Sequence, residues 1–241
     1  AYDDKSFFYS KLDKLHRPRQ IFQHILGTSP KDDKLIYNEK DERFTASFGL
    51  TSDENYYVIS ATEHTTSEVY YIHKDDKDLN PKLFIKREDG VEYSINSWAG
   101  YFWMTTNKDA EDFKVARCSH KNINQWKDFI PAKAGVLIGG LVFLKNWIIR
   151  SETSNALSKI YVRDFQSNKE EELIFTEEKV ISPGISLMQK KKETDWIRIE
   201  YDSPKTPSRV FEYNLKTKEK KLVKERIVPS GHNRNDYIVE R

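Results

Sequence analysis

The chain has 241 residues, which is enough for one large domain or two small ones. Its 40 Lys and Arg residues nearly balance 38 Asp and Glu residues, and the net charge of +2 leaves no excess for nonspecific binding of nucleic acid. The single cysteine, Cys118, excludes an internal disulfide framework and a cysteine-based zinc cluster.

The sequence also argues against a secreted or membrane-spanning protein. Three of the first five residues are charged, unlike the start of a signal peptide. The most apolar stretch, residues 134–144, is about half of the roughly 20 residues that a spanning helix needs. A lone cysteine suits a reducing compartment, so we expect a cytoplasmic protein without membrane contacts.

Short segments rich in β-branched and aromatic residues follow one another along the whole chain, separated by Gly, Pro, Asn, Asp and Lys clusters. Helical periodicity is not convincing anywhere, so we expect little helix. Three strands come first, and four sets of four strands follow them. The predicted strands are residues 6–11, 20–25 and 34–37; 44–50, 56–61, 68–73 and 82–86; 92–96, 101–106, 113–118 and 126–130; 136–144, 147–151, 159–165 and 171–175; and 180–187, 196–201, 209–215 and 220–224.

Two series of apolar residues keep the same period. The first series has spacings of 48, 46, 45 and 50 residues, and the second has spacings of 48, 46, 45 and 48. They are Ile21, Val69, Val115, Ile160 and Val210, and Leu35, Leu83, Phe129, Ile174 and Leu222. Four short strands in each period of this length are typical of an all-β fold, the β-propeller, with one antiparallel sheet per blade. A β-sandwich is the alternative, but it does not require two series with one period.

The predicted propeller is partial. It has four complete blades and a first blade that lacks its inner strand, about five in all. Because propellers usually close to protect their sheet edges, the chain resembles a piece of something larger, as does an alanine at position 1. It could stay open, close on itself as five blades, or self-associate through the exposed edge of the first blade.

Catalytic patterns are missing from the sequence. The string nearest to a Gly-x-Ser-x-Gly elbow, residues 184–188, ends in Met and falls within a predicted strand. His64 and Glu68 are best interpreted as part of a polar turn, and Cys118 as a buried thiol on a strand. No HExxH pattern or phosphate-binding glycine loop is present. We therefore predict no catalytic residue, metal site or cofactor.

Several strings nevertheless point to a family. In the first third these are residues 22–28 (FQHILGT), 33–41 (DKLIYNEKD) and 64–69 (HTTSEV), and later come 92–94 (EYS), 202–207 (DSPKTP) and 228–229 (VP). In this order they resemble the oligopeptidase B (protease II) group of the prolyl oligopeptidase family of serine peptidases. That family joins a seven-bladed propeller to an α/β-hydrolase domain with a Ser-His-Asp triad, and this group cleaves short peptides after Arg or Lys.

The resemblance implies a division of the chain. Residues 1–226 would form the propeller domain, from the second strand of blade three through blade seven. Residues 227–241 would be an exit segment that leads toward a missing α/β-hydrolase domain. No triad residue can be assigned to any position here, so this chain alone should be inactive.

Strand direction then selects one face of the propeller. Because strands alternate in direction, the connections after the second and fourth strands of each blade lie on the same face. If the hydrolase follows the fourth strand of the last blade, as the resemblance implies, it must dock on this face. Our hypothesis is that charged residues of these loops contact the catalytic domain: Glu39, Asp41, Arg43, Glu68 and Arg87. The alternative is that these charges only stabilise turns locally.

The expected role is that of a lid. A propeller over an active site admits short peptides, excludes folded proteins and commits the substrate when the domains close. Two other interpretations of the function remain open: a free-standing propeller that acts as a binding scaffold, and an inactive remnant of a split peptidase gene.

Overall fold

The computed structural model describes residues 4–186 and 192–240. Within them, regular structure is β-strand apart from two single-turn 3₁₀ helices, Pro30–Asp32 and Arg234–Asp236. None of the helices in the described ranges is long and apolar enough to cross a membrane. The chain divides into two compact units, Ala1–Lys133 and Ala134–Arg241, which are described separately.

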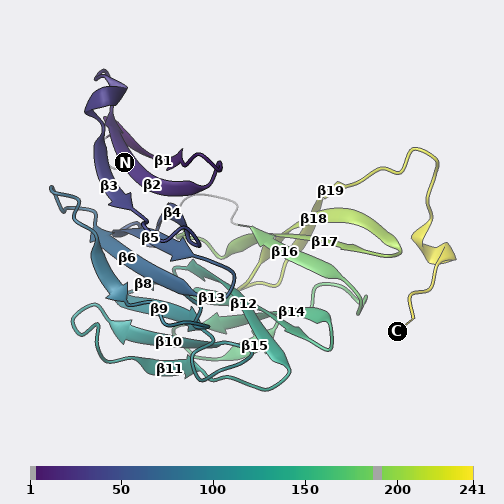
Figure 1. Ribbon diagram of the computed structural model, residues 1–241. Helices are drawn as coiled ribbons and strands as arrows, with labels where there is room; N and C mark the ends of the chain where they lie inside the picture. The colour runs from purple at the N-terminus through teal and green to yellow at the C-terminus, as the bar shows by residue number, and fades with distance from the viewer. Residues whose placement is uncertain (1–3, 187–191, 241) are drawn as a thin grey trace. The chain divides into compact units, whose positions relative to one another are not determined.

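The first unit contains three antiparallel sheets in which strands that are adjacent in sequence are also adjacent in space (Figure 1). The first sheet has three strands, and the second and third have four each. They are β1 (Ser6–Leu12), β2 (Pro18–Ile25) and β3 (Lys34–Asn38); β4 (Thr45–Leu50), β5 (Tyr56–Thr62), β6 (Ser67–His73) and β7 (Lys82–Ile85); and β8 (Tyr93–Trp98), β9 (Tyr101–Thr106), β10 (Lys114–Ser119) and β11 (Lys127–Ile130).

The second unit contains two four-stranded sheets of the same up-and-down order. The fourth sheet consists of β12 (Val136–Leu144), β13 (Trp147–Ser154), β14 (Leu157–Asp164) and β15 (Glu170–Glu172). The fifth consists of β16 (Ser182–Ser186), β17 (Trp196–Ser203), β18 (Thr206–Asn214) and β19 (Lys220–Glu225). Every predicted strand thus has a counterpart, and the all-β prediction is confirmed.

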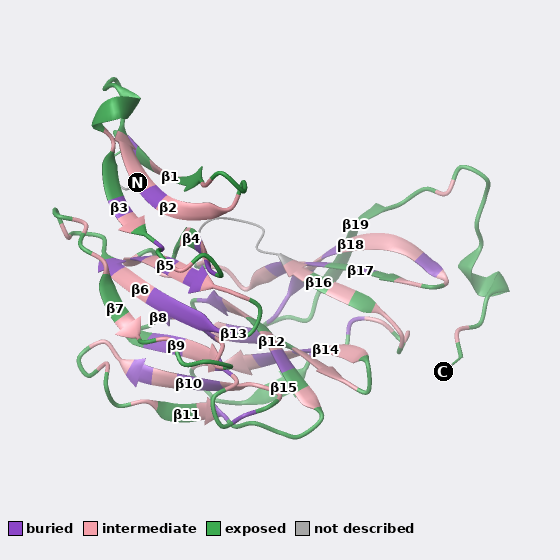
Figure 2. Ribbon diagram, in the orientation of Figure 1, coloured by how far each residue is buried: buried purple, intermediate pink, exposed green. Residues whose placement is uncertain are grey.

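Each unit has its own apolar core between its sheets. Side chains of a strand alternate between two faces, so in β5 every second residue, Tyr57, Ile59 and Ala61, is buried. Ile59 belongs to a cluster of the first and second sheets, whereas Ile199 belongs to a cluster of the fourth and fifth sheets. Figure 2 shows buried segments within inner strands such as β6, and exposed ones in the connections and in the outer strand β19. Burial of each such side chain contributes about 1.5–3 kcal/mol.

Several strand ends differ from the prediction. The hairpin of β13 and β14 continues to Ser154 and resumes at Leu157, because Asn155 and Ala156 both adopt positive φ angles, 48° and 52°, in a two-residue turn. Such a turn suits the twist of a hairpin, but the pair lacks the glycine that usually marks it.

The predicted outer strand 171–175 ends at Glu172, because Leu173 and Phe175 turn into the core. The predicted strand 180–187 corresponds to Ser182–Ser186, and Leu187 lies outside the described residues.

Candidate functional site

Four of the five charged residues that the sequence selected lie in connections of the first unit, and the fifth, Glu68, is the second residue of β6. Asp41, Arg43 and Glu39 follow β3 on the way to β4, Glu68 is at the start of β6, and Arg87 follows β7. The structure brings three of them together and leaves two as a separate pair at the surface.

Arg87 is held between two carboxylates. Its Nη2 donates to Glu39 Oε2 at 2.7 Å and to Glu68 Oε1 at 2.9 Å. The side chains of Glu39 and Glu68 are only 4% and 8% exposed, and that of Arg87 is 23% exposed. The guanidinium also lies 3.9 Å from the ring centroid of Phe44, which is cation–π distance. We call this arrangement the Glu39–Arg87–Glu68 cluster; it joins the connection after the first sheet to two segments of the second sheet.

Further donors complete the hydrogen bonding of both carboxylates. They are the Tyr37 hydroxyl and the Asp41 N–H on Glu39, at 2.8 Å each, and the Tyr70 hydroxyl and the Arg87 N–H on Glu68, at 2.7 and 3.0 Å. Burial alone would raise the pKa values of Glu39 and Glu68, but these bonds and the Arg87 charge hold both below the ordinary value. Burial, with Glu68 beside it, raises the pKa of Tyr70 to about 12. The cluster therefore contains two ionised carboxylates, one cation and two neutral phenols.

Asp41 and Arg43 form the second group. Arg43 Nη2 lies 2.9 Å from Asp41 Oδ2, and the Arg43 side chain is 69% exposed. Hydrogen bonds from Arg43 lower the pKa of Asp41 to about 2, so the carboxylate is ionised at neutral pH. This pair is accessible to another molecule or domain, whereas Glu39 and Glu68 are not.

Neighbouring connections of the first unit are fastened to one another by polar bonds that the sequence did not reveal. Arg17 donates from Nη1 to the Glu42 carbonyl at 2.7 Å. The Gly90 N–H donates to Thr66 Oγ1 at 3.1 Å, and Asn107 Nδ2 donates to the Gly90 carbonyl at 3.0 Å. The connections after second and fourth strands thus form a bonded rim.

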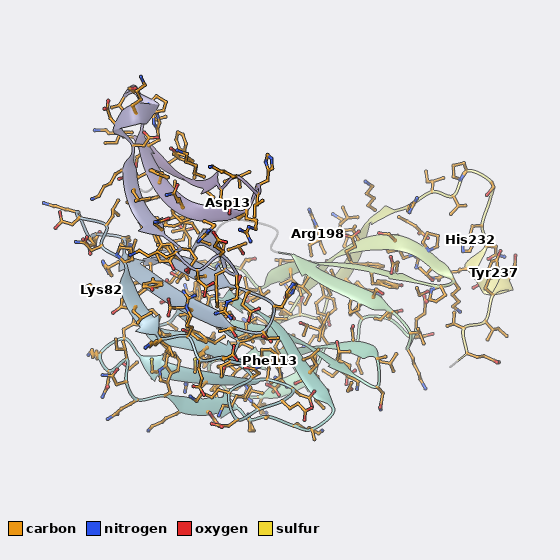
Figure 3. All side chains as sticks on the ribbon, in the orientation of Figure 1. Asp13, Lys82, Phe113, Arg198, His232 and Tyr237 are labelled. Carbon is orange, nitrogen blue, oxygen red and sulfur yellow. The ribbon has the colours of Figure 1, made fainter. Side chains whose placement is uncertain are left out.

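The second unit has a comparable arrangement. The hydroxyls of Ser203 and Thr206, in the hairpin between β17 and β18, both donate to the carboxylate of Glu178. A cavity of about 670 Å³ opens between residues 156–158, 180–182, 202–208, and 226, 228 and 232. His232 Nε2 lies 2.8 Å from the Lys205 carbonyl, and its ring stacks on Tyr237 (Figure 3).

The residues that the sequence offers as possible catalysts lie in surroundings that do not suit catalysis. Cys118 is buried on β10, so the prediction of a buried thiol on a strand is confirmed, and burial raises the pKa of this thiol to about 11. His64 is exposed, while Glu68 is engaged with Arg87. In residues 4–186 and 192–240, no group of three or more His, Cys, Asp or Glu side chains could hold a metal ion.

Comparison with known proteins identifies a family. The family model described as "Prolyl oligopeptidase, N-terminal beta-propeller domain" matches residues 1–226. The chain is 27% identical to dipeptidyl aminopeptidase BI of Pseudoxanthomonas mexicana over 99% of its own length and 33% of that protein. It is 26% identical to protease 2 of Moraxella lacunata, over 97% of this chain and 33% of that protein. It therefore spans about a third of the length of these curated relatives.

A solved structure shares the fold. Oligopeptidase B from Trypanosoma brucei, in a closed form with covalently bound antipain, superposes with a TM-score of 0.89 at 22% sequence identity. The superposition covers 97% of this chain and 34% of that protein. The sheets are therefore β-propeller blades, as the repeat predicts.

Proposed function

This chain belongs to the prolyl oligopeptidase N-terminal β-propeller family, and we propose that it is the non-catalytic propeller of an oligopeptidase B-like serine peptidase. Its partner is an α/β-hydrolase catalytic domain that carries the Ser-His-Asp triad. Residues 1–226 supply about five of seven blades, and residues 227–241 lead toward the catalytic domain. The relatives' names, dipeptidyl aminopeptidase and protease, support a peptidase as the parent protein.

In this proposal the propeller gates the active site. Short peptides pass, and the catalytic domain cleaves them after Arg or Lys. Folded proteins are excluded because the two domains must close around the substrate. The closed form of oligopeptidase B from Trypanosoma brucei, with covalently bound antipain, supports a closure step in a protein of the same fold. The single, buried cysteine suits a reducing, cytoplasmic location.

The observation that carries the proposal is the bonded rim of the first unit. Arg43 is exposed and Asp41 is partly exposed on it, and we assign them ion-pair contacts with the catalytic domain. Glu39, Glu68 and Arg87 belong to the same interface but act by positioning the Asp41 and Arg43 loop, because their charges are turned toward one another. Interdomain contacts of this polar kind can form and separate repeatedly.

The test uses the full-length protein that contains this propeller. Arg43→Glu should lower kcat/KM for an Arg-containing peptide amide several-fold. The substitution places a second carboxylate beside that of Asp41 and replaces the cation that faces the catalytic domain with an anion. The matched control is Lys159→Glu, which reverses an exposed cation paired with Glu172 in the fourth sheet and should leave turnover unchanged. Equal turnover by both variants would refute the contact.

The peptidase assignment has a separate test. Reading the gene beyond Arg241 should reveal an in-frame Gly-x-Ser-x-Gly elbow. The 241-residue chain alone should not cleave the peptide amide. A stop codon at that point, or cleavage by the isolated chain, would contradict the assignment whatever the result with Arg43.

The isolated chain should also self-associate. In the described part of the chain, β1 pairs with a strand on one side only, and Phe7 and Leu12 on it are exposed. An uncovered strand edge with apolar side chains favours pairing with a second copy. Light scattering after size exclusion should show a species larger than a monomer, and a strictly monomeric solution at all concentrations would argue against this.

A further inference from the structure

The second unit contains a further cavity, of about 910 Å³. It is lined by the connection between the fourth and fifth sheets (residues 174–180), by strands β17–β19 with the hairpin between β17 and β18, and by side chains between residues 234 and 239. Its volume falls in the range of about 300–1,000 Å³ that is usual for sites of small ligands. The cavity therefore has room for a small molecule or for the end of a short peptide, and not for a folded domain.

The C-terminal part of the lining is fixed to the fifth sheet. His232 Nε2 lies 2.8 Å from the carbonyl of Lys205, in the hairpin between β17 and β18, and the His232 ring stacks on Tyr237 (Figure 3). The Asn235 N–H donates to Asn233 Oδ1 at 3.1 Å and so caps the single 3₁₀ turn that follows. Contacts on both sides of the turn therefore hold this segment beside the hairpin.

Cations outnumber carboxylates in the lining. There are five cations and two carboxylates: Lys179, Lys205, Arg209, Lys220 and Arg234, with Glu177 and Glu178. Glu178 is already bonded to two hydroxyls, and Lys220 to a backbone carbonyl. Within residues 4–186 and 192–240, the charged groups of Lys179, Lys205 and Arg234 make no hydrogen bond or ion pair. These three cations are therefore available to an anion.

Arg209 adds a buried donor to the same cavity. Its side chain is 15% exposed, and its Nη2 donates to Glu225 Oε1 at 2.8 Å, with Tyr201 as a further neighbour of the guanidinium. In the part of the chain that the structure describes, Arg209 Nε is buried and has no hydrogen-bond partner. Buried N–H groups are normally paired, and a guanidinium bonds most strongly to an ionised acceptor. An oxyanion in the cavity would supply the acceptor that this donor lacks.

The lining also has apolar and neutral polar groups. Ile174 and Ile238, from different segments of the lining, are 75% and 85% exposed. A bare inorganic anion would cover neither side chain, so the chemistry favours a ligand with an apolar group as well as a negative charge. The Thr176 hydroxyl and the Asn235 amide line the cavity too. They can pair with the N–H and C=O groups of a peptide, whereas a fatty acid offers only a hydrocarbon chain there.

We propose that this cavity binds the C-terminal end of a short peptide. The carboxylate accepts from Arg209 Nε and is attracted by Lys205 and Arg234, and the apolar last side chain packs on Ile174 and Ile238. The inference concerns residues of the second unit, and it rests neither on the proposed peptidase activity nor on the contacts of Arg43.

The first experiment is an NMR titration of the unsubstituted 241-residue chain with acetyl-Leu-Leu, which ends in a free carboxylate. Saturable amide shifts should appear in residues 174–180 and 234–239 and at Arg209. Acetyl-Leu-Leu amide is the matched ligand, because it keeps both leucines and removes only the charge. It should bind at least about ten-fold more weakly, since a charge-assisted hydrogen bond is lost. Equal affinity for the amide, or shifts that leave these residues unaffected, would overturn the proposal.

Octanoate distinguishes the two sources of an apolar carboxylate. It has the same charge and a hydrocarbon chain but no peptide groups, so it should bind more weakly than acetyl-Leu-Leu. Octanoate binding as tight as that of the peptide would overturn the assignment of a peptide as the ligand.

The second experiment changes the lining. Arg209→Lys keeps a cation for Glu225 but removes the Nε donor, and it should weaken the binding of acetyl-Leu-Leu several-fold. Arg234→Gln removes an exposed cation outside the strands, should also weaken binding several-fold, and decides the question if Arg209→Lys does not fold. The matched control, Lys216→Gln, neutralises an exposed cation of the same unit that does not line the cavity, and it should bind like the parent. Parental affinity in both cavity variants would contradict the site.

Discussion

The two buried carboxylates and the partly buried guanidinium of the Glu39–Arg87–Glu68 cluster depend on one another. Taking a carboxylate out of water costs several kcal/mol, and a cation compensates for this only with close geometry and with the remaining lone pairs bonded. Both conditions hold, since Arg87 reaches both carboxylates and the two tyrosines complete the bonding. The cluster is stable as a set, and the loss of its cation would leave two like charges facing each other.

We predict that Arg87→Met lowers the free energy of unfolding by about 3–5 kcal/mol, because Glu39 and Glu68 would be left buried without their cation. Urea titration monitored by tryptophan fluorescence measures the change. Arg43→Met is the matched control: Arg43 is exposed and its partner Asp41 is partly exposed, so the urea midpoint of this variant should stay within error of the parent's. Similar losses in both variants would show that the buried cluster contributes no more to the free energy of unfolding than the exposed pair does.

The sequence separation of the bonded residues matches the repeat. Glu39 and Arg87 are 48 residues apart, which is one period of the repeat. Ser52 and Asn96, and Asp53 and Ser97, are bonded at a spacing of 44 residues. Equivalent positions of adjacent sheets face each other, so opposite charges one period apart indicate a contact between blades. The sequence analysis selected Glu39, Glu68 and Arg87 as separate charges and did not predict that they pair with one another, because burial cannot be inferred from a connecting loop.

At the scale of an element, the strands could be predicted and their ends could not. Alternation of apolar residues determined β5 and β17, where inward-facing side chains are buried. The end of β15 and the turn at Asn155 and Ala156 depend instead on packing and on positive φ angles without glycine, and neither leaves a pattern in the sequence.

Strand β12 contains an irregularity with a measurable consequence. Its pairing with β13 shifts between Ile138 and Leu141, where two glycines stand opposite Ser151. A Cβ added to Gly139 would clash with Ser151 Oγ, whereas one added to Gly140 would meet open space. Such a bulge tolerates a side chain at one position only.

We predict that Gly139→Ala lowers the free energy of unfolding by about 1 kcal/mol, the cost of forcing Ser151 from its rotamer. Gly140→Ala, the matched control, should not destabilise the chain. In a Ser151→Ala background, Gly139→Ala should lose its effect, since the clashing hydroxyl is gone. Denaturant unfolding of the parent chain, Gly139→Ala, Ser151→Ala and the double variant gives a double-mutant cycle, and additive effects would exclude this clash as the cause.

At the scale of the whole molecule, apolar stabilisation is divided between two cores. The cluster of the first and second sheets comes from Ile21–Ile72, and the cluster of the fourth and fifth sheets comes from Leu144–Leu215, so each lies within one compact unit. Polar contacts one period apart, such as Trp147 with Asp195 in the second unit, reinforce the packing of sheets inside a unit. Each of the two clusters is therefore built from residues of a single unit.

This division predicts where core substitutions act. Ile59→Ala and Ile199→Ala, both at fully buried sites, should each cost about 2–5 kcal/mol. Because the two side chains lie in different cores, hydrogen exchange should accelerate in residues 4–133 for Ile59→Ala and in residues 134–186 and 192–240 for Ile199→Ala. Ile174→Ala, at an exposed position of the second unit, is the control and should leave exchange unchanged. If either buried substitution accelerated exchange equally throughout the chain, the two cores would have to unfold as one cooperative unit.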